Sequence, residues 1–322
     1  MNLEPLSYYT NGILQKDRNV LSKSITLIES NADTHQATAN QLIEFCIQQN
    51  KKAKKIGISG SPGVGKSTFI NSLGKHILDN NKSIAVLAID PSSTISRGSI
   101  LGDKTRMGDL IHHKNIYIRP SANGDYLGGV ARKTYETSLI CEAFGFDYII
   151  VETVGVGQSE IEVRNIVDIF LLLLLPNAGD ELQGIKRGIM ELANIIIINK
   201  ADNEHLTKAK ISMTQIKSIL PLMNQQQRNW ETKIVLASAL ENTGIKNIYN
   251  LISNYYLSVH ENELRINQQE YWKNKIIQDL VLSKIKSHPK IKKVLEDLSI
   301  KQQNIYTNYE AIAKLIDEII LD

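Results

Sequence analysis

The chain has 322 residues, of which 42% are hydrophobic and 22% charged, with a formal net charge of +3. This composition is ordinary for a globular protein, and the length allows one large domain with extensions. The small net charge argues against nucleic acid as a partner. The most apolar stretch, Ile169–Leu175, is far shorter than the roughly 20 residues of a membrane helix, which argues against a membrane protein.

The two cysteines, Cys46 and Cys141, are far apart in the sequence. They form neither a CxxC word nor a disulfide framework, so a reduced intracellular setting fits them best. The N-terminus lacks the basic-then-apolar layout of a signal peptide. We therefore expect a cytoplasmic protein.

Residues 1–50 are predicted to be helical. Leu14, Leu21, Ile25 and Ile28 fall near a 3.6-residue period, and Leu42–Ile47 contains a second apolar stripe. A basic segment then leads into the first strand. This pattern predicts an N-terminal helical extension over 1–50.

The central part, 51–257, alternates short apolar runs with segments of helical spacing. Most runs are uninterrupted, as expected for parallel strands that helices cover on both faces. The runs are Lys55–Ser59, Ile84–Ile89, Ile116–Ile118, Tyr148–Val151, Ile169–Leu175, Ile195–Ile198 and Ile234–Leu236. A series of this kind predicts an α/β fold with a doubly wound, mostly parallel sheet. Ligands of such sheets bind beyond the carboxyl ends of the strands.

Residues 258–322 are rich in Gln, Asn, Lys and Ile and contain no strand-like run. The spacing of Trp272, Ile276, Leu280 and Ile285 predicts a long helix, which His288-Pro289 is expected to break. The sequence therefore predicts a C-terminal helical arm.

A phosphate-binding loop (P-loop) follows the first predicted strand and opens a helix. Its residues are Gly60, Ser61, Pro62, Gly63, Val64, Gly65, Lys66, Ser67 and Thr68. The glycines let backbone N–H groups converge on phosphate oxygens, and the helix N-terminus adds partial positive charge. Lys66 is expected to reach the β- and γ-phosphates, and Ser67 to place its hydroxyl on Mg²⁺. The motif predicts that a nucleoside triphosphate binds here.

A second motif, Asn199-Lys200-Ala201-Asp202, follows the predicted strand Ile195–Ile198. The Asp202 carboxylate can accept hydrogen bonds from guanine N1–H and the 2-amino group, a donor pair that adenine lacks. Asn199 can bond the base edge, and the Lys200 stem can lie over the ring. The next strand leads into Ser238, Ala239 and Leu240, whose backbone N–H groups are expected to meet guanine O6. The two motifs together predict a GTPase.

Acidic residues follow two other predicted strands. Asp90 and Glu152 are expected to hold water around Mg²⁺ near Ser67, because magnesium keeps several waters when bound. Helix capping is the alternative role for Asp90. Asp103 lies in a polar loop and is a further candidate for the metal.

The segment after Glu152 is a candidate sensor of hydrolysis. Gly155 is expected to offer its N–H to the γ-phosphate, and Gln158 is a candidate for positioning water. Arg97, Arg106 and Arg132 are open candidates for an arginine finger, with a structural or solvated role as the alternative for each.

Several motifs resemble those of the MeaB/ArgK/MMAA GTPases, the G-protein chaperones of adenosylcobalamin-dependent acyl-CoA mutases. The matching words are the P-loop, Asp90–Ser93, Gly98–Met107, Leu127–Arg132, Glu152–Glu160, Pro176–Glu191 and Asn199–Asp202. The likeness runs from about residue 10 into the C-terminal arm. Asn177 departs from the family pattern, which has Gly there.

The resemblance implies a homodimer whose arm, residues 258–322, makes the dimer contact. It also implies a mutase partner, methylmalonyl-CoA mutase or a relative, whose loading with adenosylcobalamin the protein gates and protects. It places Mg²⁺ near Ser67, Asp90, Asp103 and Glu152, and it treats Lys186 and Asp180 as residues that answer the nucleotide state. The chain has no DxHxxG word, so any corrinoid contact is expected through the partner.

Three other functions stay open from the sequence. A metallochaperone GTPase shares the architecture but usually needs metal-binding cysteines or histidines, and here the pair His112-His113 and the isolated cysteines offer few. A P-loop small-molecule kinase is disfavoured by Asn199–Asp202, since kinases usually take ATP. The third alternative is a scaffold that binds nucleotide without hydrolysing it.

Overall fold

The computed structural model describes residues 3–89, 110, 113–119, 127–153, 159–176, 187–222 and 230–293, together with 309, 313–314 and 316–317. The chain forms two compact units, Met1–Arg265 and Ile266–Asp322. The first unit contains the sheet and both nucleotide motifs.

The sheet of the first unit has seven strands in the order β3-β2-β4-β1-β5-β6-β7, and all neighbouring strands are parallel. The strands are β1 (Lys54–Gly60), β2 (Ile84–Ile89), β3 (Ile116–Arg119), β4 (Tyr148–Thr153), β5 (Ile169–Leu174), β6 (Ile195–Ile198) and β7 (Lys233–Leu236). Because the strands run in one direction, their carboxyl ends share one edge. β1 is central, so the loop after it lies at the middle of that edge.

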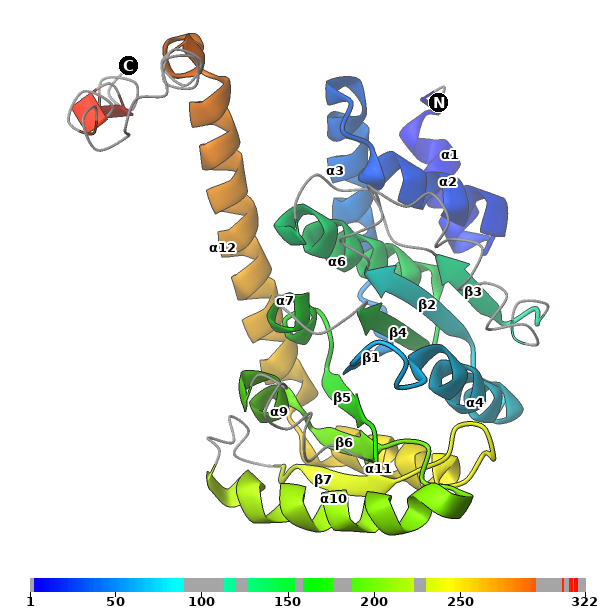
Figure 1. Ribbon diagram of the computed structural model, residues 1–322. Coiled ribbons are helices and arrows are strands. Elements are labelled where there is room, and N and C mark those ends of the chain that lie inside the picture. Colours follow the sequence, from blue (N-terminus) through cyan, green and yellow to red (C-terminus); the bar gives the residue numbers. More distant parts are fainter. Residues whose placement is uncertain are drawn as a thin grey trace. The chain divides into compact units, whose positions relative to one another are not determined.

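Helices cover both faces of the sheet (Figure 1). The connecting helices are α4 (Lys66–Asp79), α6 (Leu127–Phe144), α7 (Ser159–Arg164), α9 (Arg187–Leu192), α10 (Leu206–Ile219) and α11 (Ile245–Ser258), with short 3₁₀ turns η1 (Asn203–His205) and η2 (Leu220–Leu222). Helices α4 and α11 lie on the same face and contact each other. The predicted doubly wound α/β fold is confirmed.

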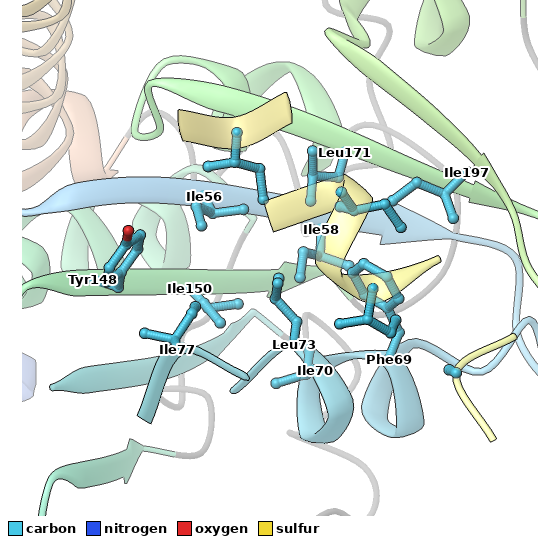
Figure 2. Close-up of a cluster of buried hydrophobic side chains, with 14 of the residues drawn as sticks. Ile56, Ile58, Phe69, Ile70, Leu73, Ile77, Tyr148, Ile150, Leu171 and Ile197 are labelled. Atoms are coloured by element: carbon cyan, nitrogen blue, oxygen red, sulfur yellow. The ribbon is translucent and has the colours of Figure 1, made fainter. Parts of the chain in front are cut away.

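The main hydrophobic core lies between the sheet and the face covered by α4 and α11. Figure 2 shows Ile56 and Ile58 of β1 packed with Phe69 and Leu73 of α4, and all four are fully buried. Each such side chain contributes about 1.5–3 kcal/mol relative to an exposed one. This packing fixes the start of α4, and therefore the P-loop, against the central strand.

Three helices precede the sheet: α1 (Leu6–Leu14), α2 (Arg18–Glu29) and α3 (Asp33–Gln48). The side chain of Asp17 caps α2 by accepting a hydrogen bond from Asn19 N at 2.8 Å. Arg18 then donates to the backbone oxygen of Ile116 at 2.7 Å. Helix α2 is thereby fastened to β3, the outermost strand, and both α2 and α3 pack on α6.

A buried cluster of ion pairs lies at the amino ends of β1 and β5. Lys55 Nζ is 2.9 Å from Glu142 Oε2, while Arg265 binds Glu142 Oε1 at 3.1 Å and Asp168 Oδ2 at 2.8 Å. Burial raises the pKa of Asp168 and lowers the pKa of Lys55, and the neighbouring opposite charges act against both shifts. The cluster joins α6 and the sheet to Arg265, the last residue of the first unit.

The second unit begins inside α12 (Glu261–Ser287), the 27-residue helix that the sequence predicts there. The helix ends at Ser287, so the predicted break at His288-Pro289 is confirmed. Ile277, Leu280, Val281 and Leu282 are each at least half exposed on it.

Candidate nucleotide-binding site

The P-loop connects the end of β1 to the first residue of α4. Gly63 and Gly65 have φ values of 78° and 96°, a left-handed conformation that side chains disfavour. Lys66 Nζ donates to the backbone oxygens of Gly60 at 2.8 Å and Ser61 at 3.3 Å. The loop therefore curls around the lysine ammonium, as a loop that wraps phosphate oxygens requires.

The remaining P-loop residues differ in exposure. Pro62, Gly63 and Thr68 are exposed, whereas Val64 is fully buried under the loop. Ser67 is half-buried at the start of α4, the helix that follows the carboxyl end of β1. The structure thus brings the predicted Lys66 and Ser67 together at the N-terminus of one helix.

Asn199 follows β6 and ties the P-loop to the second motif. Its Nδ2 donates to Val64 O at 2.8 Å, and its Oδ1 accepts from Ala239 N at 3.1 Å. The residue is 1% exposed. A Cβ at Gly65 would come 2.8 Å from Asn199 Nδ2, so the glycine also permits this close approach. The structure shows Asn199 joining two loops, a role the sequence does not suggest.

Asp202 is held from one side by the loop after β7. Ser238 Oγ donates to Asp202 Oδ2, and the amide of Glu241 donates to Ser238 Oγ at 3.2 Å. Ser238 is fully buried, while Asp202 is half-buried. A carboxylate fixed in this way, with part of its surface accessible, is suited to accept two parallel N–H bonds from a base edge.

The loop after β7 is closed by two backbone hydrogen bonds between Ser238 and Thr243, at 3.0 and 3.1 Å. Between them, Ala239 is buried and Leu240 is 80% exposed. Lys200 is exposed, with a left-handed φ of 57°. All predicted base-recognition residues therefore lie in two loops at the carboxyl edge of β6 and β7.

Glu152 lies within β4, opposite Ile58 of β1 and Ala88 of β2. It is 6% exposed and is the penultimate residue of β4, near the carboxyl edge of the sheet. The neighbouring Thr153 donates from Oγ1 to Ser59 Oγ at 2.9 Å. The predicted metal residues Asp90 and Asp103 lie outside the described residues, as do Gly155, Gln158, Asp180 and Lys186.

Within the described ranges, no three His, Cys, Asp or Glu side chains gather closely enough to hold a metal ion. Over the same ranges, no helix has the length and apolarity needed to cross a membrane. Ser67 and Glu152 are the two described members of the predicted magnesium set, and their hydroxyl and carboxylate oxygens fit a hard cation.

Comparisons with known proteins define the class. Residues 21–290 match the family model for methylmalonyl-CoA mutase-associated GTPase MeaB. A protein of Mycobacterium bovis named as a GTPase is 43% identical over 286 residues, covering 88% of this chain and 85% of its own length. The mouse homologue of the methylmalonic aciduria type A protein is 39% identical over 295 residues, covering 87% of this chain and 71% of its own length.

A solved structure shares the fold over the length of the chain. The crystal structure of an LAO/AO transport system kinase superposes with a TM-score of 0.77 at 29% identity, covering 98% of this chain and 99% of that chain. The site and these relatives define a P-loop GTPase. Within that class, the chain belongs to the MeaB family of methylmalonyl-CoA mutase-associated GTPases, as its motifs indicate.

Proposed function

We propose that this GTPase is the chaperone of an adenosylcobalamin-dependent acyl-CoA mutase, methylmalonyl-CoA mutase or a relative. In this role it gates loading of the cofactor and protects the mutase. The match to the MeaB family over residues 21–290 carries the proposal, because that family is described by its association with this mutase. The match spans the whole sheet and all of α12.

Hydrolysis of GTP by attack of water is the reaction that the site supports. Lys66, in the curl of the P-loop, stabilises charge on the transferring phosphoryl group. Mg²⁺, when bound, neutralises phosphate charge, and Ser67 and Glu152 are the described residues that would hold it, with Asp90 and Asp103 as further proposed ligands. Gln158 is the proposed water-positioning residue, and Lys186 is proposed to respond to the nucleotide.

We further propose a homodimer formed through the C-terminal arm. Support comes from the apolar side chains that α12 leaves at least half exposed, among them Ile277, Leu280 and Val281. Exposed apolar patches on a helix usually mark a protein contact. No corrinoid motif is visible in the sequence, so the proposal assigns corrinoid contact to the mutase partner.

The cytoplasm is the proposed location. Cys46 and Cys141 are both free and buried, and free thiols are typical of reducing compartments. Burial also raises the pKa of both thiols, which makes them poor metal ligands and weakens the metallochaperone alternative.

Reconstitution with apo-mutase and adenosylcobalamin tests the proposal. We expect GTP to change the rate at which the cofactor enters the mutase, and a Lys66→Ala variant to abolish this dependence. A capture experiment from native extract with a non-hydrolysable GTP analogue should recover the mutase. Loading that is indifferent to the GTPase and to GTP would contradict the chaperone function while leaving GTP hydrolysis intact.

A further inference from the structure

The backbone of Ala239 is held by side chains from two other elements. Its N–H donates to Asn199 Oδ1 at 3.1 Å, and its C=O accepts from Ser72 Oγ at 2.7 Å. Asn199 follows β6, while Ser72 lies in α4, the helix that the P-loop opens. The middle residue of the guanine-recognition loop is thus held through both its backbone N–H and its backbone C=O.

The hydrogen bond from Ser72 to Ala239 is buried and of ordinary length. Both residues are buried, with Ser72 9% and Ala239 4% exposed, and 2.7 Å is the usual length of a hydroxyl–oxygen bond. A buried carbonyl that loses such a partner is costly, because water cannot readily replace it. The Ser72 hydroxyl is therefore one of the contacts that hold the loop in position, and the one that α4 supplies.

We propose that Ser72 is a positioning residue for guanine specificity. It fastens the Ser238–Leu240 loop to the P-loop helix, so that the loop that recognises the base is in place before nucleotide arrives. Lys66 is the first residue of α4, and Ser72 follows it six residues later in the same helix. One helix then orients both Lys66, which binds phosphate, and the Ser238–Leu240 loop, which recognises the base. The inference rests on GTP recognition at this site.

The expected change in nucleotide affinity follows from the pre-organisation of the Ser238–Leu240 loop. Apparent affinity falls in proportion to the fraction of protein in the binding-competent arrangement. Loss of one buried hydrogen bond shifts such an equilibrium by about tenfold. The loss applies to ligands that use the base loop and spares ligands that use the P-loop alone.

Binding of two probes in the presence of Mg²⁺ tests this. GTP engages both ends of the site, whereas inorganic triphosphate engages the P-loop alone. For Ser72→Ala we expect GTP affinity to fall about tenfold and triphosphate affinity to stay within about twofold. Ser72→Thr, which keeps a hydroxyl, should restore GTP affinity to within about threefold of wild type.

Ser253→Ala is the matched control. It also removes a serine hydroxyl bonded to a backbone oxygen, here Tyr249 O within α11, and it leaves the Ala239 contacts intact. We expect wild-type affinity for both probes. A general loss of stability would weaken GTP and triphosphate together.

Two results would overturn the assignment of Ser72: unchanged GTP affinity in the folded alanine variant, or equal weakening of GTP and triphosphate. Failure of the wild-type protein itself to prefer GTP over ATP would instead remove the GTPase assignment, and the role of Ser72 with it. The wild-type measurement therefore separates the two conclusions.

Discussion

We propose that Asp202 determines which base the site prefers, and replacing one carboxylate oxygen of this residue by an amide nitrogen should change that preference. Its Oδ2 is fixed by Ser238, which leaves the carboxylate oriented toward the base-recognition loop. In Asp202→Asn the amide can donate to the O2 of xanthine but repels the donors of guanine. We expect GTP to weaken about a hundredfold and XTP to become the preferred nucleotide, measured by competition binding. An unchanged base preference would remove Asp202 from this role.

The two thiols give a prediction about pH. Burial raises the pKa of Cys46 to about 12 and raises that of Cys141 as well, from a normal value of 9.0. Above pH 9 the unfolded chain loses these protons while the folded chain keeps them, so the free energy of unfolding falls as pH rises. The slope should reach about 1.4 kcal/mol per pH unit for each thiol.

Denaturant titrations between pH 8 and 11 measure that slope, with Cys141→Ala as the comparison that removes one thiol. At pH 8 both thiols should react with a labelling reagent only as fast as the protein unfolds. Rapid labelling of folded protein would show that the thiols are accessible.

For single residues, the sequence predicts which side chains form the site better than it predicts their hydrogen-bond partners. Lys66, Ser67 and Asp202 lie where their motifs place them, because each motif is a local pattern of loop and helix start. The bonds of Asn199 to Val64 and of Ser72 to Ala239 join residues more than 130 positions apart. No spacing rule reports such contacts, so these roles came from the structure.

Helix α7 is fastened to the P-loop strand by a buried chain of hydroxyls. Thr153 donates to Ser59 Oγ at 2.9 Å, and Ser59 lies 3.4 Å from Glu160 Oε1, a long hydrogen bond. All three residues are fully buried. The single hydroxyl of Ser59 thus contacts residues on both sides of the 154–158 segment.

Thr153→Val should loosen this connection. The change leaves the Ser59 hydroxyl without the buried donor that orients it toward Glu160 of α7, so we expect faster amide hydrogen exchange in α7 and a loss of about 1–2 kcal/mol in stability. Exchange in β6 should not change beyond that global loss. Thr153→Ser keeps the donor and serves as the control; an α7 that exchanges at the wild-type rate in the valine variant would show that the chain does not hold it.

The strands of the sheet are the part of the structure that the sequence predicts best. All seven strands were found from their apolar runs, because strands buried on both faces leave uninterrupted hydrophobic stretches. The predicted strand ends differ from the observed ends by one or two residues: β1 includes Gly60, and β4 includes Glu152 and Thr153. Backbone pairing with neighbouring strands continues past the last apolar side chain, which the sequence pattern alone does not report.

Across the whole molecule, the buried ion cluster connects the sheet to the start of the arm. In Arg265→Met the carboxylates of Glu142 and Asp168 lose a buried cationic partner. Removal of one member of such a cluster should cost about 3–5 kcal/mol in the free energy of unfolding, measured by denaturant titration. GTP affinity should persist in the folded protein, since the cluster is at the amino edge of the sheet and the nucleotide motifs are at the carboxyl edge.

Lys82→Ala is the matched control for that change. Lys82 pairs with Asp147 at 3.1 Å, but both side chains are more than one third exposed. Its removal should cost less than about 1 kcal/mol. Equal effects of the two substitutions would show that burial does not set the strength of the cluster.

The cluster was invisible in the sequence for a simple reason. The four residues Lys55, Glu142, Asp168 and Arg265 come from four separate parts of the chain, and each alone resembles an ordinary surface charge. The apolar spacing after residue 258, in contrast, predicts the long helix that the structure describes as α12. The composition of a segment can be read directly from the sequence, whereas ion pairs between distant residues form only when the chain folds.

We propose that one site binds a triphosphate at the end of β1 and recognises guanine at the ends of β6 and β7. Calorimetric titration of the full chain with GTP and with ATP, in the presence of Mg²⁺, tests it most directly. We expect GTP to bind at least about a thousandfold more tightly than ATP. Equal binding of the two nucleotides, or binding of neither, would contradict it.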